Sequence, residues 1–162
     1  MIDPAQPHAD DRNKTTDLFA RLAARMTGGL TGHLGIELAE ARPGYLAARL
    51  TIGPQHCAAN GYLHAGTVVT LADSACGFGC IASLPPGAHN FTTVELKSNF
   101  LRSVTTGTIT AVAQLIHGGR RTQVWDATVF DPAQRPLALF RCTQMILYPD
   151  TARADTGHSE PV

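Results

Sequence analysis

The sequence predicts an α+β domain in which one long apolar helix is covered by antiparallel strands. A proline-free, largely apolar segment runs from Ala65 to Ala82, alternating segments precede and follow it, and short breaks separate the later ones. Short breaks favour antiparallel neighbours. With 162 residues, the chain is the size of one domain. We expect this domain to span residues 14 to 149, with disordered tails at residues 1 to 13 and 150 to 162, which are polar and without periodicity.

The first expected element is a short helix near the N-terminus. Thr15 or Thr16 followed by Asp17 is a capping signal, and Gly28-Gly29 is a stop signal. Between them, three apolar residues recur at helical spacing: Leu18, Leu22 and Met26. These three side chains are expected to face the core.

Two alternating segments, residues 34 to 41 and 45 to 52, flank the turn signal Arg-Pro-Gly and predict an antiparallel hairpin. After the central helix and a Pro-Pro-Gly break, four further segments read as strands: residues 90 to 101, 106 to 117, 121 to 131 and 136 to 148. We expect these four strands to form a meander.

Asp73 is the single carboxylate of the central apolar segment. At about 100° per residue, the side of the helix opposite Asp73 carries apolar residues expected to face the core: Val68, Leu71, Ala75, Phe78 and Ala82. Its own side carries small or apolar residues and no lysine, arginine or glutamate: Gly66, Val69, Thr70, Cys76, Gly77 and Cys80.

One interpretation of this pattern is a surface helix with a solvated aspartate. The missing charges favour the other, in which a curled sheet covers the helix and leaves the side of Gly66 and Gly77 free to approach a second subunit. An isolated buried carboxylate costs several kcal/mol, which indicates that Asp73 serves chemistry rather than stability.

Composition excludes several classes of partner. Only 16% of the residues are charged, against about 25% in typical domains, which favours a homo-oligomer. The sequence has equal numbers of basic and acidic residues, 13 of each, so it has no net positive charge to attract nucleic acid or an anionic membrane. The N-terminus lacks a secretory signal, so we expect a cytoplasmic protein. Four cysteines without CxxC spacing indicate no metal site, and no cofactor is indicated.

The segment GYLHAGTVVTLADSACG, followed by VELKSNFLRSV and GRRTQVWDATVFDPAQRPLALFRCTQMI, resembles the thioesterases of phenylacetate degradation. The resemblance covers about residues 30 to 148 and includes the spacing of nine residues between His64 and Asp73. It implies a hotdog fold and hydrolysis of acyl- or aryl-coenzyme A thioesters by a dimer, often a dimer of dimers. Two positions depart from the family: Ala65 replaces a glycine, and Asn60 lies four rather than six residues before the histidine.

Thioester hydrolysis needs a polarised carbonyl and a group that attacks it or activates water. The N–H groups of Ala65 and Gly66 at a helix start can polarise the carbonyl. Asp73 can act as nucleophile or as general base, and the sequence leaves both open. Because Asp73 lies about 12 Å along the helix from Ala65, one helix cannot hold the whole site. Two antiparallel copies would complete two sites per dimer.

Other candidates have competing interpretations. His64 could be a base, but a role in holding the turn is favoured. Thr93 aligns with a family position that offers a hydroxyl to the attacking water, although threonine is also ordinary in strands. Arginines suit the phosphates of coenzyme A. The substrate-binding candidates are therefore Asn60, Asn99, Arg102, Arg120 and Arg121.

Two alternative functions remain open from the sequence. A hotdog hydratase or dehydratase would need a histidine with a carboxylate poised at substrate carbons, and no convincing second acid is visible. A non-catalytic acyl-CoA-binding protein would have no need of Asp73, whose retention favours the hydrolase.

Overall fold

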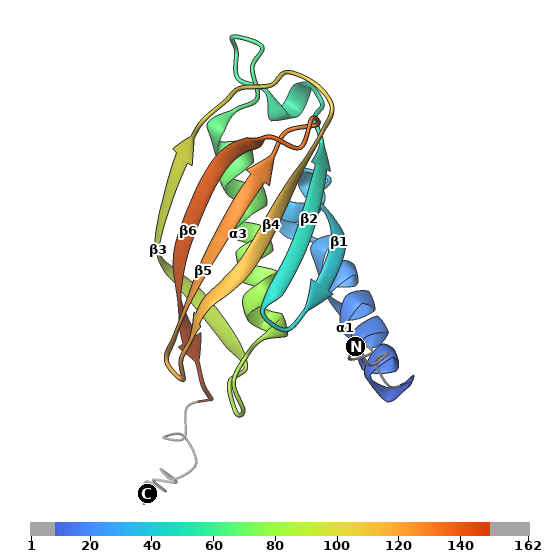
Figure 1. Ribbon diagram of the computed structural model, residues 1–162, viewed down its shortest axis with the longest axis vertical. Helices are drawn as coiled ribbons and strands as arrows, with labels where there is room; N and C mark the ends of the chain where they lie inside the picture. The colour runs from blue at the N-terminus through green and yellow to red at the C-terminus, as the bar shows by residue number, and fades with distance from the viewer. Residues whose placement is uncertain (1–8, 150–162) are drawn as a thin grey trace, which may run out of the picture.

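A six-stranded antiparallel sheet curves around one long helix, α3 (Ala65–Ala82), in the computed structural model (Figure 1). The structure describes residues 9 to 149, with side chains from residue 16 onward. The strands are β1 (Glu37–Arg42), β2 (Tyr45–Thr51), β3 (Asn90–Phe100), β4 (Thr108–Gly118), β5 (Thr122–Phe130) and β6 (Pro136–Leu147). This confirms the predicted α+β class, and α3 has the bounds expected from the sequence.

The N-terminal helix α1 (Ala9–Met26) is longer than expected. It begins at Ala9 rather than at a cap near Thr15, so residues 9 to 13 are helical and the expected tail boundary is wrong there. Leu22 and Met26 are buried as predicted, and the helix packs against β1. A short helix that the sequence did not predict, α2 (Gly29–His33), follows directly. The remaining tail residues lie outside the described part of the chain.

The predicted hairpin is confirmed. Strands β1 and β2 pair antiparallel through Arg42 and Tyr45, and Gly44 takes φ 78° in the turn between them. A side chain is strained at this positive φ, which explains glycine there.

The expected four-strand meander is wrong in one element. The strand order is β1-β2-β4-β5-β6-β3, so β3 pairs with β6 at the sheet edge rather than with β4. Residues 101 to 107 carry the chain over the N-terminal end of α3 from one edge to the middle of the sheet (Figure 1). Leu63 N–H donates to Val104 O at 3.0 Å, which ties this crossover to the segment before α3. Strand β4 can then pair with β2 and join the hairpin to the same sheet.

Helix α3 forms the centre of the core, with Val68, Leu71 and Ala75 buried as predicted. Its length and apolar composition would also suit a membrane span, but half of that segment is buried inside the domain. Its position in the core explains why α3 is so apolar, because every strand of the sheet contacts the helix.

Two glycines of α3, Gly77 and Gly79, allow close packing against the sheet. A Cβ on Gly77 would lie 2.9 Å from the Phe91 ring, and one on Gly79 would lie 2.8 Å from the Trp125 ring. The expectation that Gly77 stays free to meet another subunit is therefore wrong. Phe91 of β3 already occupies that space.

Candidate active site

Asp73 lies at the middle of α3, where it faces β3 and a pocket of about 280 Å³. The pocket has apolar walls and a polar rim contributed by α1, α3 and β3: Arg25, Asp73, Ser74, Gly77, Phe78, Ile81, Asn90 and Phe91. The carboxylate is half-buried, and its Oδ1 is enclosed without a hydrogen-bond partner among the described residues. Such an atom is rare in a folded protein and needs an explanation. A reacting group supplies one, because a water or substrate atom would complete its bonding.

Burial raises the pKa of Asp73, and the nearby Thr93 hydroxyl acts in the opposite direction. The same hydroxyl donates to Gln144 Oε1 at 2.9 Å. A hydroxyl has one hydrogen and serves one acceptor at a time, so the Thr93 hydroxyl can donate to Gln144 or to Asp73 but not to both at once. Thr93 thus lies beside Asp73, while the carboxylate keeps an unsatisfied oxygen.

The start of α3 is capped by His64. Its Nδ1 accepts a hydrogen bond from Gly66 N–H at 2.8 Å, and its backbone is extended, with φ −69° and ψ 135°. This contact is the turn-holding role favoured from the sequence. It also occupies the Gly66 N–H, which was expected to be free as an oxyanion donor. Ala65 N–H has no acceptor in the described part of the chain, so Ala65 is the available donor.

Asp73 and Ala65 do not act together within one protomer. Eight residues of helix separate them by about 12 Å at 1.5 Å per residue, far beyond hydrogen-bond reach. The structure therefore agrees with the sequence argument that one helix cannot contain both halves of the site.

Arg102 lies beside the start of α3. Together with Ala65 and Phe100 it lines a depression of about 340 Å³, and its guanidinium donates to Pro136 O. Asn60 lies in the exposed loop before α3, where its Oδ1 accepts from Tyr62 N–H at 3.2 Å. That bond gives Asn60 a role in shaping the loop.

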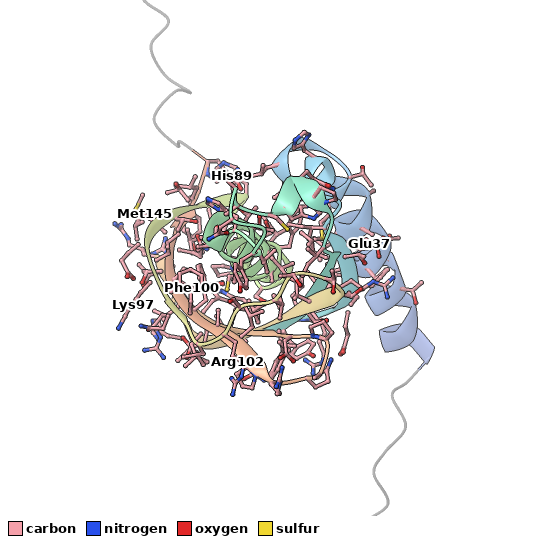
Figure 2. All side chains as sticks on the ribbon, turned by 90° about the horizontal axis from the view of Figure 1, so that it is seen from above. Glu37, His89, Lys97, Phe100, Arg102 and Met145 are labelled. Atoms are coloured by element: carbon pink, nitrogen blue, oxygen red, sulfur yellow. The ribbon has the colours of Figure 1, made fainter. Side chains whose placement is uncertain are left out.

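The structure does not bring the other binding candidates to Asp73. Asn99 lies with Lys97 and Arg141 in a depression on the outer face of the sheet; Figure 2 shows Lys97 on that outer side and Phe100 on the inner side. Arg120 and Arg121 lie at the β4–β5 hairpin, beside a pocket of about 490 Å³.

The two helix cysteines are not poised as nucleophiles. Cys76 and Cys80 are both buried. Burial raises the pKa of Cys80 to about 12, and contact with the Cys142 thiol together with burial raises that of Cys76. Both remain protonated thiols near neutrality.

Sequence reasoning missed two residues near Asp73. Arg25, from the end of α1, lines its pocket, and fully buried Gln144 bonds Thr93. The signal for Gln144 was present in β6, because it is a polar residue in the core-facing row with Phe140 and Cys142. No local signal marked Arg25, whose position depends on how α1 packs.

Residues 60 to 138 match the family model described as the thioesterase superfamily. The chain is 35% identical over 115 residues to a 1,4-dihydroxy-2-naphthoyl-CoA hydrolase of Listeria monocytogenes, covering 71% of this chain and 93% of that protein. The chain belongs to the thioesterase superfamily.

Further relatives agree with this assignment. The acyl-coenzyme A thioesterase PaaI of Escherichia coli is 30% identical, over 67% of this chain and 75% of that protein. Among solved structures, a mutant of thioesterase PA1618 from Pseudomonas aeruginosa aligns with a TM-score of 0.75 at 28% identity, covering 80% and 93% of the two chains. The E. coli PaaI structure aligns at 0.73 and 25%, covering 82% and 96%. The expected hotdog fold is confirmed, and the chain is a thioesterase-family hydrolase.

Proposed function

We propose that this chain hydrolyses acyl- or aryl-coenzyme A thioesters as a homodimer, with each site built from Asp73 of one protomer and the start of α3 of its partner. The observation that carries the proposal is the enclosed, unpartnered Oδ1 of Asp73, about 12 Å along the helix from the free N–H of Ala65. The Asp73 carboxylate lacks a nearby donor for the carbonyl oxygen, and the Ala65 N–H lacks a nearby base or nucleophile.

Strand β3 supports a route to such a dimer. It is a sheet edge with unpaired backbone groups, and it exposes three apolar side chains, Val94 (54%), Leu96 (43%) and Phe100 (48%). Exposed edges of this kind favour pairing with another strand.

The geometry of one protomer suggests how two β3 strands would meet. Thr93 lies beside Asp73, and Phe100 shares a depression with Ala65. An antiparallel pair with its two-fold axis between Leu96 and Lys97 sets Thr93 opposite Phe100 of the partner. Asp73 then lies at the level of Ala65 of the partner, and the symmetry creates two sites.

In this arrangement the residues have complementary roles. Ala65 N–H, at the positive end of the α3 dipole, donates to the thioester carbonyl oxygen. Asp73 either removes a proton from water, whose oxygen bonds the carbonyl carbon, or attacks that carbon itself. In the first route the oxyanion collapses, the C–S bond breaks and the thiolate of coenzyme A takes up the proton that Asp73 removed. In the second route the same collapse leaves an anhydride between the acyl group and Asp73, which water then hydrolyses, and one proton of that water passes to the thiolate. Thioester and water thus become acid and thiol.

The pocket beside Asp73 suits the acyl group. Phe78, Ile81 and Phe91 provide apolar walls, and its volume of about 280 Å³ in one protomer accommodates an aromatic ring system. The relative from L. monocytogenes is named for a naphthoyl thioester, which supports aromatic acyl groups as the first substrates to test.

The candidates for phosphate binding fall at one end of the same dimer. Arg121 O accepts from Ile146 N–H, and Ile146 pairs with Phe91 on β3. In the proposed pairing Phe91 lies opposite Arg102 of the partner. Arginines from both protomers would therefore approach the nucleotide end of coenzyme A.

Two inactive variants test the shared site. Asp73→Asn should lower kcat for a panel of acyl-CoA substrates at least a hundredfold and leave the dimer intact. Ala65→Pro removes the proposed donor with little harm to the helix, because proline is favoured at the first helical position and His64 already has the extended backbone required before it. Ala65→Gly, which keeps the N–H, is the matched control.

Mixing the two inactive variants under conditions of subunit exchange should restore about a quarter of the wild-type activity, since half of the dimers are mixed and each has one intact site. A mixture as inactive as its parents would contradict the shared site. Unchanged turnover in Asp73→Asn would remove Asp73 from the mechanism.

A further inference from the structure

Arg25, near the end of α1, lines the same pocket as Asp73. Helix α3 lies between β3 and α1 (Figure 1), and all three elements contribute side chains to this pocket. Helix α1 precedes residues 60 to 138, the part of the chain that matches the family model. The contribution of Arg25 to the pocket therefore lies outside the region that the family model covers.

The Arg25 guanidinium has no partner in the described part of the chain. Its side chain makes no hydrogen bond or ion pair there, whereas Arg21, one turn earlier on α1, pairs with Asp17 at 3.6 Å. Arg25 also forms no ion pair with Asp73, although both side chains line one pocket. Burial raises the pKa of Asp73, and a guanidinium in contact with the carboxylate would lower it. The charge of Arg25 is thus available to a ligand in the pocket.

Two neutral polar side chains of the pocket, Ser74 and Asn90, also have no partners among the described residues. The Ser74 hydroxyl makes no hydrogen bond, whereas that of Thr70 on the same helix donates to Gly66 O at 2.8 Å. The side chain of Asn90, at the start of β3, makes no hydrogen bond either. Hydroxyl, amide and guanidinium groups all carry donor hydrogens. The polar rim of the pocket therefore offers several donors to an acceptor group.

The rest of the pocket has the shape and polarity of an acyl site. On α3, Asp73, Gly77 and Ile81 follow one another at intervals of four residues, so they lie along one side of the helix over about 12 Å. Phe78 and Phe91 complete the apolar walls. An acyl group with its thioester carbon at Asp73 would fill this space with its ring or chain.

The charges of the pocket decide which acyl groups suit it. Asp73 is the single carboxylate among the described residues of the lining, and the proposed mechanism places it at the thioester carbon. Arg25 is always charged, and a guanidinium binds a carboxylate through two parallel hydrogen bonds. The phosphates of coenzyme A do not suit this position, because the pantetheine arm separates them from the thioester.

We infer that Arg25 is a specificity-determining residue that binds an anionic oxygen group on the acyl part of the substrate. The chain then prefers acyl-CoA thioesters whose acyl group carries a carboxylate of its own. Ser74 and Asn90 add neutral donors beside the guanidinium. This inference rests on the proposed hydrolase function and names the substrate class of the same site.

The test compares benzoyl-CoA with meta- and para-carboxybenzoyl-CoA. In the wild type, at least one carboxylated substrate should have a kcat/KM about tenfold above that of benzoyl-CoA, because a hydrogen bond to a charged group is stronger than one to a neutral group. Arg25→Gln should bring this ratio to about one or below. The ratio comes from one preparation, so it does not depend on how much of the variant is folded.

Arg21→Gln is the matched control, because Arg21 is also an exposed arginine of α1 but does not line the pocket. It should leave the ratio as in the wild type. Arg25→Lys keeps the charge without the paired donors, so its ratio should fall between those of the wild type and Arg25→Gln.

Reversing the charge should produce a gain that structural damage cannot. Arg25→Glu should hydrolyse para-aminomethylbenzoyl-CoA, which carries an ammonium group, with a kcat/KM about tenfold above that of the wild type. The same variant should discriminate against both carboxylated substrates.

The outcomes separate this inference from the proposed function. Equal kcat/KM values for the three benzoyl substrates in the wild type overturn the role of Arg25, while the hydrolase proposal stands. An equal loss on all three in Arg25→Gln also overturns it and assigns Arg25 to coenzyme A binding. A wild-type protein that hydrolyses none of them overturns the proposed function, and this inference with it.

Discussion

Replacing Asp73 with asparagine should make the protein more stable as well as inactive. The carboxylate is half-buried with one enclosed oxygen that has no partner, and a buried charge costs free energy unless it is paired and hydrogen-bonded. Asparagine has nearly the same shape, so the packing of α3 is retained while the charge is removed. We expect a gain of about 1 kcal/mol near pH 8, or roughly 3 °C in Tm for a domain of this size.

The gain in stability of Asp73→Asn should be larger at high pH than at low pH. Burial raises the pKa of Asp73 in the folded protein above its ordinary value of 3.8. The folded state therefore holds this proton more tightly than the unfolded state, and wild-type stability falls as pH rises through the folded-state pKa. Asp73→Asn lacks this penalty. Its advantage should be full above that pKa and small near pH 4, where the wild-type carboxyl is protonated.

Thermal and urea melts of both proteins at pH 4 and pH 8 measure this difference. The protomer concentration must be equal in all samples, because the stability of a dimer depends on it. A variant less stable than wild type at pH 8, or equally stabilised at both pH values, would refute the description of Asp73 as a carboxylate held at a cost in free energy.

Three further predictions concern assembly, substrate binding and packing. Leu96→Glu should weaken the dimer more than tenfold and lower activity in parallel, since burying an unpaired carboxylate costs several kcal/mol. The control Leu30→Glu, at an exposed position in α2, should leave the sedimentation of the dimer unchanged. A monomer that still hydrolyses the substrate would contradict the shared site. Replacing Arg120 and Arg121 together with alanine should raise KM for CoA esters about tenfold but not for a short thioester lacking the nucleotide, and equal effects on both substrates would argue against phosphate contacts. Gly79→Ala should destabilise the protein by about 1–3 kcal/mol, because its Cβ would lie 2.8 Å from Trp125. Gly28→Ala has 3.9 Å to its nearest neighbour, and in urea melts it should show only the smaller loss, about 0.5 kcal/mol, that alanine causes at the N-cap of α2.

Much of the candidate site was predictable because it lies within one helix. The positions of Ala65 and Asp73 relative to each other follow from helical geometry, and so does the inference that a second copy is needed. The state of each group was only partly predictable. The turn-holding role of His64 was favoured from the sequence, but its bond to the Gly66 N–H was not foreseen. Asn99 faces the outer side of the sheet, which depends on the bulge between Thr93 and Glu95 that resets the alternation of β3.

The binding residues were harder to place because arginine and asparagine occur on any solvent-facing surface. Arg102 lies beside the start of α3, but Arg120 and Arg121 belong to a distant hairpin. Their convergence in the proposed dimer requires the second protomer. Arg25 was missed altogether, since only the packing of α1 brings that residue to the Asp73 pocket.

By itself the sequence determined the bounds of α3, the hairpin of β1 and β2 and the strand segments of the sheet, since periodicity and turn residues act over a few neighbouring positions. It also marked Asp73 as a charge inside an apolar helix. Only the tertiary structure decided that β3 crosses to the edge beside β6, because strand pairing between distant segments is set by packing around α3 and not by local pattern. That single placement pairs Thr93 with Gln144 and leaves β3 open for a partner.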